Sequence, residues 1–145
     1  MNIFKRLYRF MKYNRHKRMS IWALILSAIY RLEILTIKPN TLHKRWGIEG
    51  KESPEKESDE NYIYAIKVSY CVDKICTKTK WESKCLVRAL TAQHILSKKH
   101  IHTTLYLGCG LEDKKMVAHA WLRCGELYVT GGNGEGYAVV SKFYK

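Results

Sequence analysis

Two side chains in this 145-residue sequence are suited to nucleophilic chemistry, the thiol of Cys85 and the imidazole of His119. Residues 81–96 have a helical pattern with Ser83 as the expected N-cap, so the thiol of Cys85 is predicted to lie in the first turn of the helix. Free backbone N–H groups and the helix dipole stabilise a thiolate there, and the same N–H groups can bind the oxyanion of an acyl-transfer intermediate. Because a free cysteine is more often a small buried apolar side chain, position alone does not identify a nucleophile.

His119 strengthens the argument because a cysteine nucleophile needs a base to take its proton. It lies between two alanines, Ala118 and Ala120, in an apolar segment with the periodicity of a strand. A strand packed against the cysteine helix would hold the imidazole in a fixed position. The alternative is a hydrogen-bonded histidine of the core. We expect Cys85 and His119 to form a catalytic pair, since one pairing explains both residues.

A third group is expected to orient the imidazole through its second nitrogen. No aspartate follows His119, and the downstream candidates are Glu126, Asn133 and Glu135. Asn133 is the first choice, because the glycine-rich segment 130–136 could return to the histidine. Glu126 is expected to be a solvated turn residue, and a backbone carbonyl of the glycine-rich segment is the remaining alternative.

The elements that must position these residues begin with a basic helical region. Residues 2–14 are predicted to form a basic amphipathic helix, and a second helix should run from Ser20 to about Leu35. Its apolar run, residues 21–30, is about half of the ~20 residues that a membrane span needs, so a buried or interfacial helix is expected. The acidic segment 51–60 is predicted to be a mobile loop.

The second part of the chain changes from helical to strand periodicity. Residues 61–77 are predicted to be helical, with Ile63, Ile66, Tyr70 and Cys71 facing inward. The cysteine helix follows, and then four short strands, predicted at 103–109, 116–123, 126–130 and 137–141. Helices followed by an antiparallel meander indicate an α+β fold. We divide the chain into a basic region, 1–60, and a core, 61–145, within one structural domain.

Charge and cysteine content limit the partners and the compartment. The formal net charge is +13, and residues 1–50 carry eleven Lys and Arg against two acidic residues. This excess fits a solvated surface as well as a docking face for an acidic peptide, a partner protein or a membrane. No nucleic-acid-binding motif is present, so nucleic acid is not an expected partner. The odd count of five cysteines without a secretory signal predicts reduced thiols in the cytoplasm, and the lack of a C-x-x-C pair argues against a metal site.

The sequence resembles the lasso-peptide leader peptidases, which belong to the transglutaminase-core group of papain-like cysteine proteases. The resemblance covers about residues 78–143 and rests on four segments: Trp81-x3-Cys85-Leu86, Ala89-Leu90-x2-Gln93-x2-Leu96, Leu105-x-Leu107-Gly108 and Ala118-His119-Ala120-Trp121-Leu122. It implies a papain-like core with Cys85 as nucleophile and His119 as base, and substrate-binding or supporting roles for Trp81, Gln93 and Trp121. The family usually has an aspartate as third member shortly after the His-Ala-Trp strand, where this chain has Thr130-Gly131-Gly132-Asn133.

The resemblance also implies a reaction and its partners. Such a peptidase removes the leader from a ribosomally made precursor without a cofactor, and an ATP-dependent macrolactam synthetase then closes the lasso ring. This chain has no room for an appended leader-binding domain, so it resembles the stand-alone protease that acts with a small leader-binding protein. Two alternatives stay open: transglutaminase-like acyl transfer to an amine, and a non-enzymatic basic module that binds a peptide, a membrane or RNA. Membrane contact by residues 2–14 is not favoured by the sequence alone.

Overall fold

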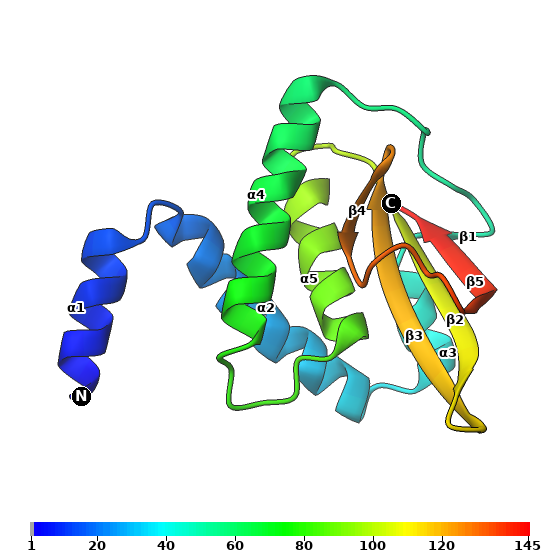
Figure 1. Cartoon of the computed structure of the whole chain (residues 1–145), viewed down its shortest axis with the longest axis horizontal. Helices are drawn as coiled ribbons and strands as arrows, with labels where there is room; N and C mark the ends of the chain where they lie inside the picture. Colours follow the sequence, from blue (N-terminus) through cyan, green and yellow to red (C-terminus); the bar gives the residue numbers. More distant parts are fainter. Residues whose placement is uncertain (1) are drawn as a thin grey trace.

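The fold is α+β, as predicted, with helices on one side and a five-stranded antiparallel sheet on the other (Figure 1). The computed structural model describes residues 2–145. The elements in chain order are α1 (Ile3–Tyr13), α2 (Lys17–Thr36), α3 (Pro39–Leu42), the 3-10 turn η1 (His43–Arg45), β1 (Ile48–Glu49), α4 (Asp59–Cys76), α5 (Cys85–Ser97), β2 (Thr104–Glu112), β3 (Lys115–Cys124), β4 (Leu127–Thr130) and β5 (Ala138–Tyr144).

Helix α5 is the centre of the core, because it packs against α2, α4 and the sheet. Most of the apolar face expected for this helix is buried, namely Ala89, Leu90, Gln93 and Leu96. Facing them, the sheet contributes Leu105 and Leu122 among other fully buried side chains. Removing such side chains from water is the main favourable term in folding, so the helix that begins at Cys85 is also the one most firmly held.

The sheet is not the simple meander that was expected. The strand order is β1-β5-β2-β3-β4, so β5 pairs with β2 instead of following β4 at the edge. The chain between β4 and β5 therefore crosses the sheet, as the orange-to-red connection in Figure 1 shows. Gly131, Gly132, Gly134 and Gly136 all have positive φ in this connection, a backbone conformation that side chains with a Cβ disfavour.

Two helices differ from the prediction in their boundaries or buried face. Helix α4 buries small residues on the side facing its neighbours, Ala65, Val68, Cys71, Val72 and Cys76, whereas Ile63, Ile66 and Tyr70 are exposed. The inward placement of those three was wrong, and that of Cys71 was right. Helix α2 packs against α4 and also buries small residues on its inner side. The side of α4 that carries small residues is therefore the side that can pack against α2. Ser20 is not an N-cap: α2 starts at Lys17, and Ser20 is buried within it.

The acidic segment 51–60 is held against the sheet, contrary to the prediction of a mobile loop. Ser53 is buried, and its N–H donates to the Thr104 hydroxyl at 2.7 Å. The guanidinium of Arg123 on β3 donates to the carbonyls of Ser53 and Pro54 at 3.1 and 3.3 Å. Helix α4 then begins inside the segment, with the Ser58 hydroxyl accepting the N–H of Asn61 as an N-cap.

Arg123 is expected to be the strongest single link between this segment and the sheet. Arg123→Leu would leave the carbonyls of Ser53, Pro54 and Gly125 without this donor, at a cost of about 2–4 kcal/mol in the free energy of unfolding. Urea denaturation measures this loss. The matched control is Arg45→Leu, since Arg45 is exposed and paired with Glu33, and its loss should cost less than about 1 kcal/mol. Equal losses in the two variants would contradict the assignment.

Candidate active site

Cys85 is the first residue of α5, and it is partly exposed. The expected cap, Ser83, is not the N-cap, because its hydroxyl pairs with that of Thr79 at 2.9 Å and its carbonyl accepts the Arg88 guanidinium at 2.9 Å. The N-cap is Lys84, whose side chain makes no capping hydrogen bond. The N–H groups of the first turn of α5 are therefore uncapped by any described side chain, and uncapped N–H groups at a helix N-terminus are able to bind an anion.

Cys85 and Cys109 are the two cysteines of the chain with partial exposure. The other three, Cys71, Cys76 and Cys124, are buried. Burial raises the pKa of all three thiols, that of Cys124 to about 11. These three are thus kept as neutral, inert thiols at physiological pH.

The imidazole of His119 is held from three sides on β3. Its ring stacks on Trp121, with centroids 5.8 Å apart and planes 22° apart. Tyr137, at the end of the crossing connection, covers it with a centroid distance of 4.6 Å. The Nε2 atom lies 2.6 Å from the carbonyl oxygen of Gly131. The position and the plane of the ring are therefore set by contacts from β3 and from the glycine-rich connection.

The contact with Gly131 also determines which nitrogen of His119 can act as a base. A carbonyl oxygen accepts hydrogen bonds and cannot donate them, so Nε2 must carry the proton. In the neutral imidazole Nδ1 is then unprotonated and free to accept. The arrangement leaves one nitrogen as hydrogen-bond anchor and the other as candidate base.

Only glycine suits position 131. Its φ of +77° is in the left-handed region, and a Cβ there would collide with the backbone carbonyl of Ala120. Gly134, three residues later, approaches the ring of Trp121 so closely that a side chain would overlap with it. The connection can therefore lie flat over Trp121 and present a carbonyl to His119.

Asn133, the first choice for the orienting residue, is not the group bonded to Nε2. It is exposed, and its Oδ1 accepts the N–H of Glu135 at 3.0 Å within the glycine-rich connection. The carbonyl alternative weighed from the sequence, with Gly131 as its source, is the contact that the structure contains. Gly131 occupies the stretch in which the leader peptidases usually have an aspartate. This position in the family pattern was the one signal in the sequence that an orienting group lies there.

Tyr137 is a site residue that the sequence analysis missed. Its hydroxyl donates to Glu112 at 2.8 Å, while its ring packs on His119. The pKa of Tyr137 is raised, mainly by the hydrogen bond that its hydroxyl donates to Glu112. Helix α5, which begins at Cys85, packs against β3, which carries His119.

The direct contact between Cys85 and His119 stays a prediction. Between residues 2 and 145 no hydrogen bond joins the thiol to the imidazole. In enzymes of this kind such bonds are often long without substrate and tighten when it binds.

The three residues with expected supporting roles have different surroundings. Trp121 touches the imidazole. The indole N–H of Trp81 donates to the Ser27 hydroxyl of α2 at 3.3 Å, which ties the segment before Cys85 to that helix. Gln93 is buried in α5, and its Nε2 has no hydrogen-bond partner among the residues described. Trp121 thus contacts the imidazole directly, whereas Trp81 holds the segment before Cys85 against α2.

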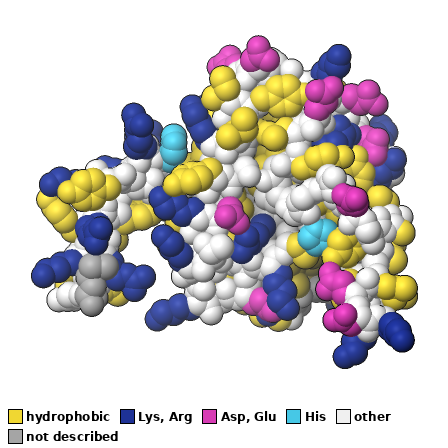
Figure 2. Space-filling view, viewed as in Figure 1, with side chains coloured by type: hydrophobic (Ala, Val, Ile, Leu, Met, Phe, Trp, Pro, Cys, Tyr) yellow, Lys and Arg dark blue, Asp and Glu magenta, His cyan; other side chains and the backbone are white. Residues whose placement is uncertain are grey.

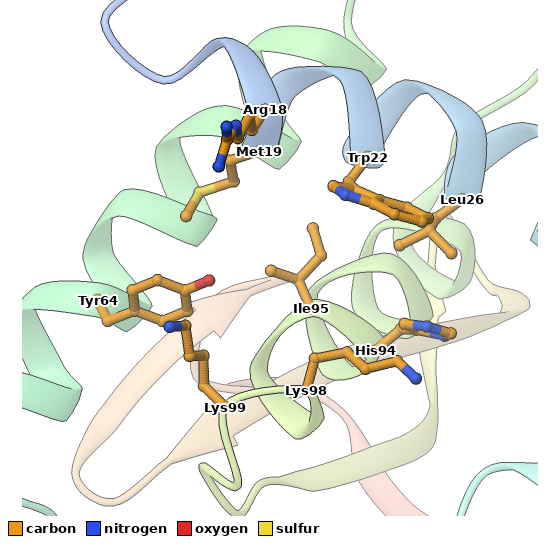
Figure 3. Close-up of a pocket in the computed structure, with 9 residues that line it drawn as sticks. All are labelled: Arg18, Met19, Trp22, Leu26, Tyr64, His94, Ile95, Lys98 and Lys99. Atoms are coloured by element: carbon orange, nitrogen blue, oxygen red, sulfur yellow. The ribbon is translucent and has the colours of Figure 1, made fainter.

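One cavity adjoins the glycine-rich connection, and another lies away from it. The first, about 170 Å³, lies between α4, α5 and β4, and Gly131, Gly132 and the Arg88–Asp73 ion pair line it. The second, about 470 Å³, lies between α2, α4 and the end of α5 opposite Cys85 (Figure 3). The first therefore borders the residue whose carbonyl meets the His119 imidazole, Gly131.

Residues 40–142 match the family model described as the transglutaminase-like superfamily. The chain belongs to this superfamily. No significant match was found among curated proteins or among solved structures. Members of the superfamily are usually enzymes, cysteine proteases or acyltransferases. The matched region contains Cys85, His119 and the glycine-rich connection, whereas α1 and α2 precede it.

Cys85 is expected to be the most reactive thiol of the chain. At pH 7.5 iodoacetamide should alkylate it about tenfold faster than Cys109, because the uncapped N–H groups of α5 stabilise the reacting thiolate. Peptide mass spectrometry of the timed reaction measures both rates in one sample. His119→Ala should slow the alkylation of Cys85 and leave that of Cys109 unchanged. Equal rates for the two thiols in the wild-type protein would contradict an activated Cys85.

Proposed function

We propose that this protein is a cysteine peptidase that removes the leader from a ribosomally synthesised lasso-peptide precursor. The observation that carries the proposal is the His119–Gly131 hydrogen bond, which leaves Nδ1 of His119 available as a base. The chain is transglutaminase-like, and it has a cysteine at an uncapped helix N-terminus, as such a base requires. The order of the Trp81-x3-Cys85 and His119-Ala-Trp121 segments supports the leader peptidases within that superfamily.

The first half of the reaction is acylation of Cys85. The thiolate sulfur attacks the scissile carbonyl carbon at the junction of leader and core, and a C–S bond forms while the carbonyl oxygen becomes an oxyanion. The N–H of Cys85 and a neighbouring N–H of the first turn donate to that oxyanion. His119, protonated at both nitrogens after taking the thiol proton on Nδ1, then gives this proton to the departing amine of the core peptide.

The second half is hydrolysis of the acyl-enzyme. Nδ1 of His119 takes a proton from water, the hydroxide oxygen attacks the thioester, and the C–S bond breaks to release the leader as a carboxylate. The Gly131 carbonyl keeps Nε2 protonated throughout, so the tautomer needed for both steps is maintained. A carbonyl stabilises the imidazolium less than a carboxylate would, because it bears no full charge.

The proposed partners follow from the family resemblance and from charge. They are the leader of the precursor, a small leader-binding protein that presents it, and the macrolactam synthetase that takes up the core peptide, all in the cytoplasm. The net charge of +13 would speed the approach of an acidic leader or presenting protein.

The central test is the cleavage of a candidate precursor by the full chain with and without a leader-binding protein, followed by mass spectrometry. Cys85→Ala should abolish cleavage, while precursor binding measured by fluorescence anisotropy is kept. Cys109→Ala is the matched control and should cleave normally. Undiminished cleavage by Cys85→Ala would refute the thiol mechanism. Incorporation of a labelled amine in place of water would assign the acyl-transferase alternative instead.

The orienting role of Gly131 predicts that a substitution at position 131 is more harmful than one at position 133. Gly131→Ala should displace the carbonyl from His119 and lower kcat/KM by about a hundredfold, since a shift of about 1 Å has such an effect. Asn133→Ala removes one turn hydrogen bond and should cost less than about tenfold. Circular dichroism checks that both variants are folded. The reverse order of effects would make Asn133 the orienting residue.

A further inference from the structure

Helix α1 has an apolar face that nothing in the described chain covers. None of its residues is buried, and in Figure 1 it stands away from the body of the protein. Five large exposed side chains of this helix form the face, namely Ile3, Phe4, Leu7, Tyr8 and Met11. They recur at spacings of three and four, so they share one side of the helix. An isolated surface helix gains nothing from such a face in water, and the face therefore points to a binding surface.

Helix α2 continues this apolar surface because it is apolar on both sides. Its inner side is packed against α4 and α5 through Ser20, Ala23, Leu26 and Ser27. Its outer side exposes a second set of large apolar residues, Ile21, Trp22, Leu24, Ile25, Ile29, Leu32 and Leu35. We call the exposed apolar residues of α1 and α2 together the N-terminal apolar surface.

The charges around the N-terminal apolar surface indicate its partner. Residues 2–32 contain no acidic residue and carry the cations Lys5, Arg6, Arg9, Lys12, Arg15, Lys17, Arg18 and Arg31. In α1 the basic residues lie on the side opposite the apolar face, and Figure 2 shows both kinds of side chain gathered on this helix. Phe and Leu on one face and Lys and Arg on the other are typical of helices that lie in the interface of an anionic membrane.

The cavity between α2, α4 and α5 adds to this surface at the start of α2. Trp22 and Arg18 project from α2 on one side of it, and Lys98 and Lys99 line the other side (Figure 3). The remaining lining is mostly apolar. A partly exposed tryptophan with cations beside it matches the depth of lipid headgroups, where tryptophan is enriched.

We propose that α1 and the outer side of α2 bind the surface of an anionic phospholipid membrane. This inference does not depend on the proposed peptidase activity. By length and composition α2 could also cross a membrane. However, its Ser27 hydroxyl accepts from Trp81 and its Arg31 pairs with Glu82 at 2.8 Å, and both partners belong to the segment before Cys85. Because insertion across the bilayer would break these contacts and uncover the core, α2 lies on the membrane.

The test is flotation of the full chain with vesicles of phosphatidylcholine and phosphatidylglycerol (7:3) and with vesicles of phosphatidylcholine alone. Binding is expected to the anionic vesicles, and it should fall at least about tenfold between 50 and 500 mM salt. Phe4→Glu with Leu7→Glu, at side chains that are 74% and 59% exposed, should abolish binding without unfolding. The matched control is Leu111→Glu with Met116→Glu, a cross-strand pair of the β2–β3 hairpin that is 73% and 78% exposed, and it should bind normally.

Two further measurements separate the remaining outcomes. Vesicles should shift the fluorescence of Trp22 to the blue, and Trp22→Phe should remove the shift, because Trp46 and Trp121 are already buried and the partly buried Trp81 is tied to α2 by its hydrogen bond to Ser27. Lys5→Gln with Lys12→Gln should weaken binding about tenfold or more. Equal binding to both vesicle types, or loss of binding in the hairpin control, would overturn the proposal. A dimer of the wild-type protein that Phe4→Glu with Leu7→Glu converts to a monomer would also overturn the proposal, because the apolar face would then bind a second copy. So would vesicle-bound protein that resists alkaline carbonate extraction, because such resistance indicates a membrane-spanning helix.

Discussion

The hydrogen bond between His119 Nε2 and the Gly131 carbonyl is the contact on which the candidate site depends. It fixes the tautomer of the imidazole, and so it decides which nitrogen is available as a base. A neutral backbone acceptor gives orientation without a charge. In the candidate site the imidazole is therefore oriented as in a catalytic triad, but by a neutral carbonyl in place of an ionised third side chain. Such a solution needs a backbone that passes very close to β3, which explains the glycines of the connection.

Trp121 connects this contact to the rest of the molecule. It stacks on His119 on one side and on Tyr106 on the other. Tyr106 in turn donates to Glu52 and accepts from Arg123, which holds the acidic segment against the sheet. The position of the imidazole is thus coupled through stacked rings to a segment far away in the sequence.

Helix α5 both forms the centre of the core and carries the candidate nucleophile. Its middle is the most deeply buried part of the core, and its first residue is the candidate nucleophile. Burial of the helix keeps the N–H groups of its first turn in place, which is what the proposed oxyanion-binding role requires of them. The N-terminal helices contribute differently: α2 completes the core with one side, while its outer side and α1 are left for a partner.

The sequence by itself determined the longer helices, the four strands after α5, the Cys85 and His119 candidates and the α+β class, because periodicity and turn residues are local properties. The tertiary structure alone decided which stripe of α4 is buried, since small residues are selected by the closeness of α2. It also decided that the chain crosses from β4 to β5 over β3, and that Gly131 and not Asn133 meets the imidazole. A backbone carbonyl has no side-chain identity, so the sequence could offer it only as an alternative to Asn133 and could not choose between them.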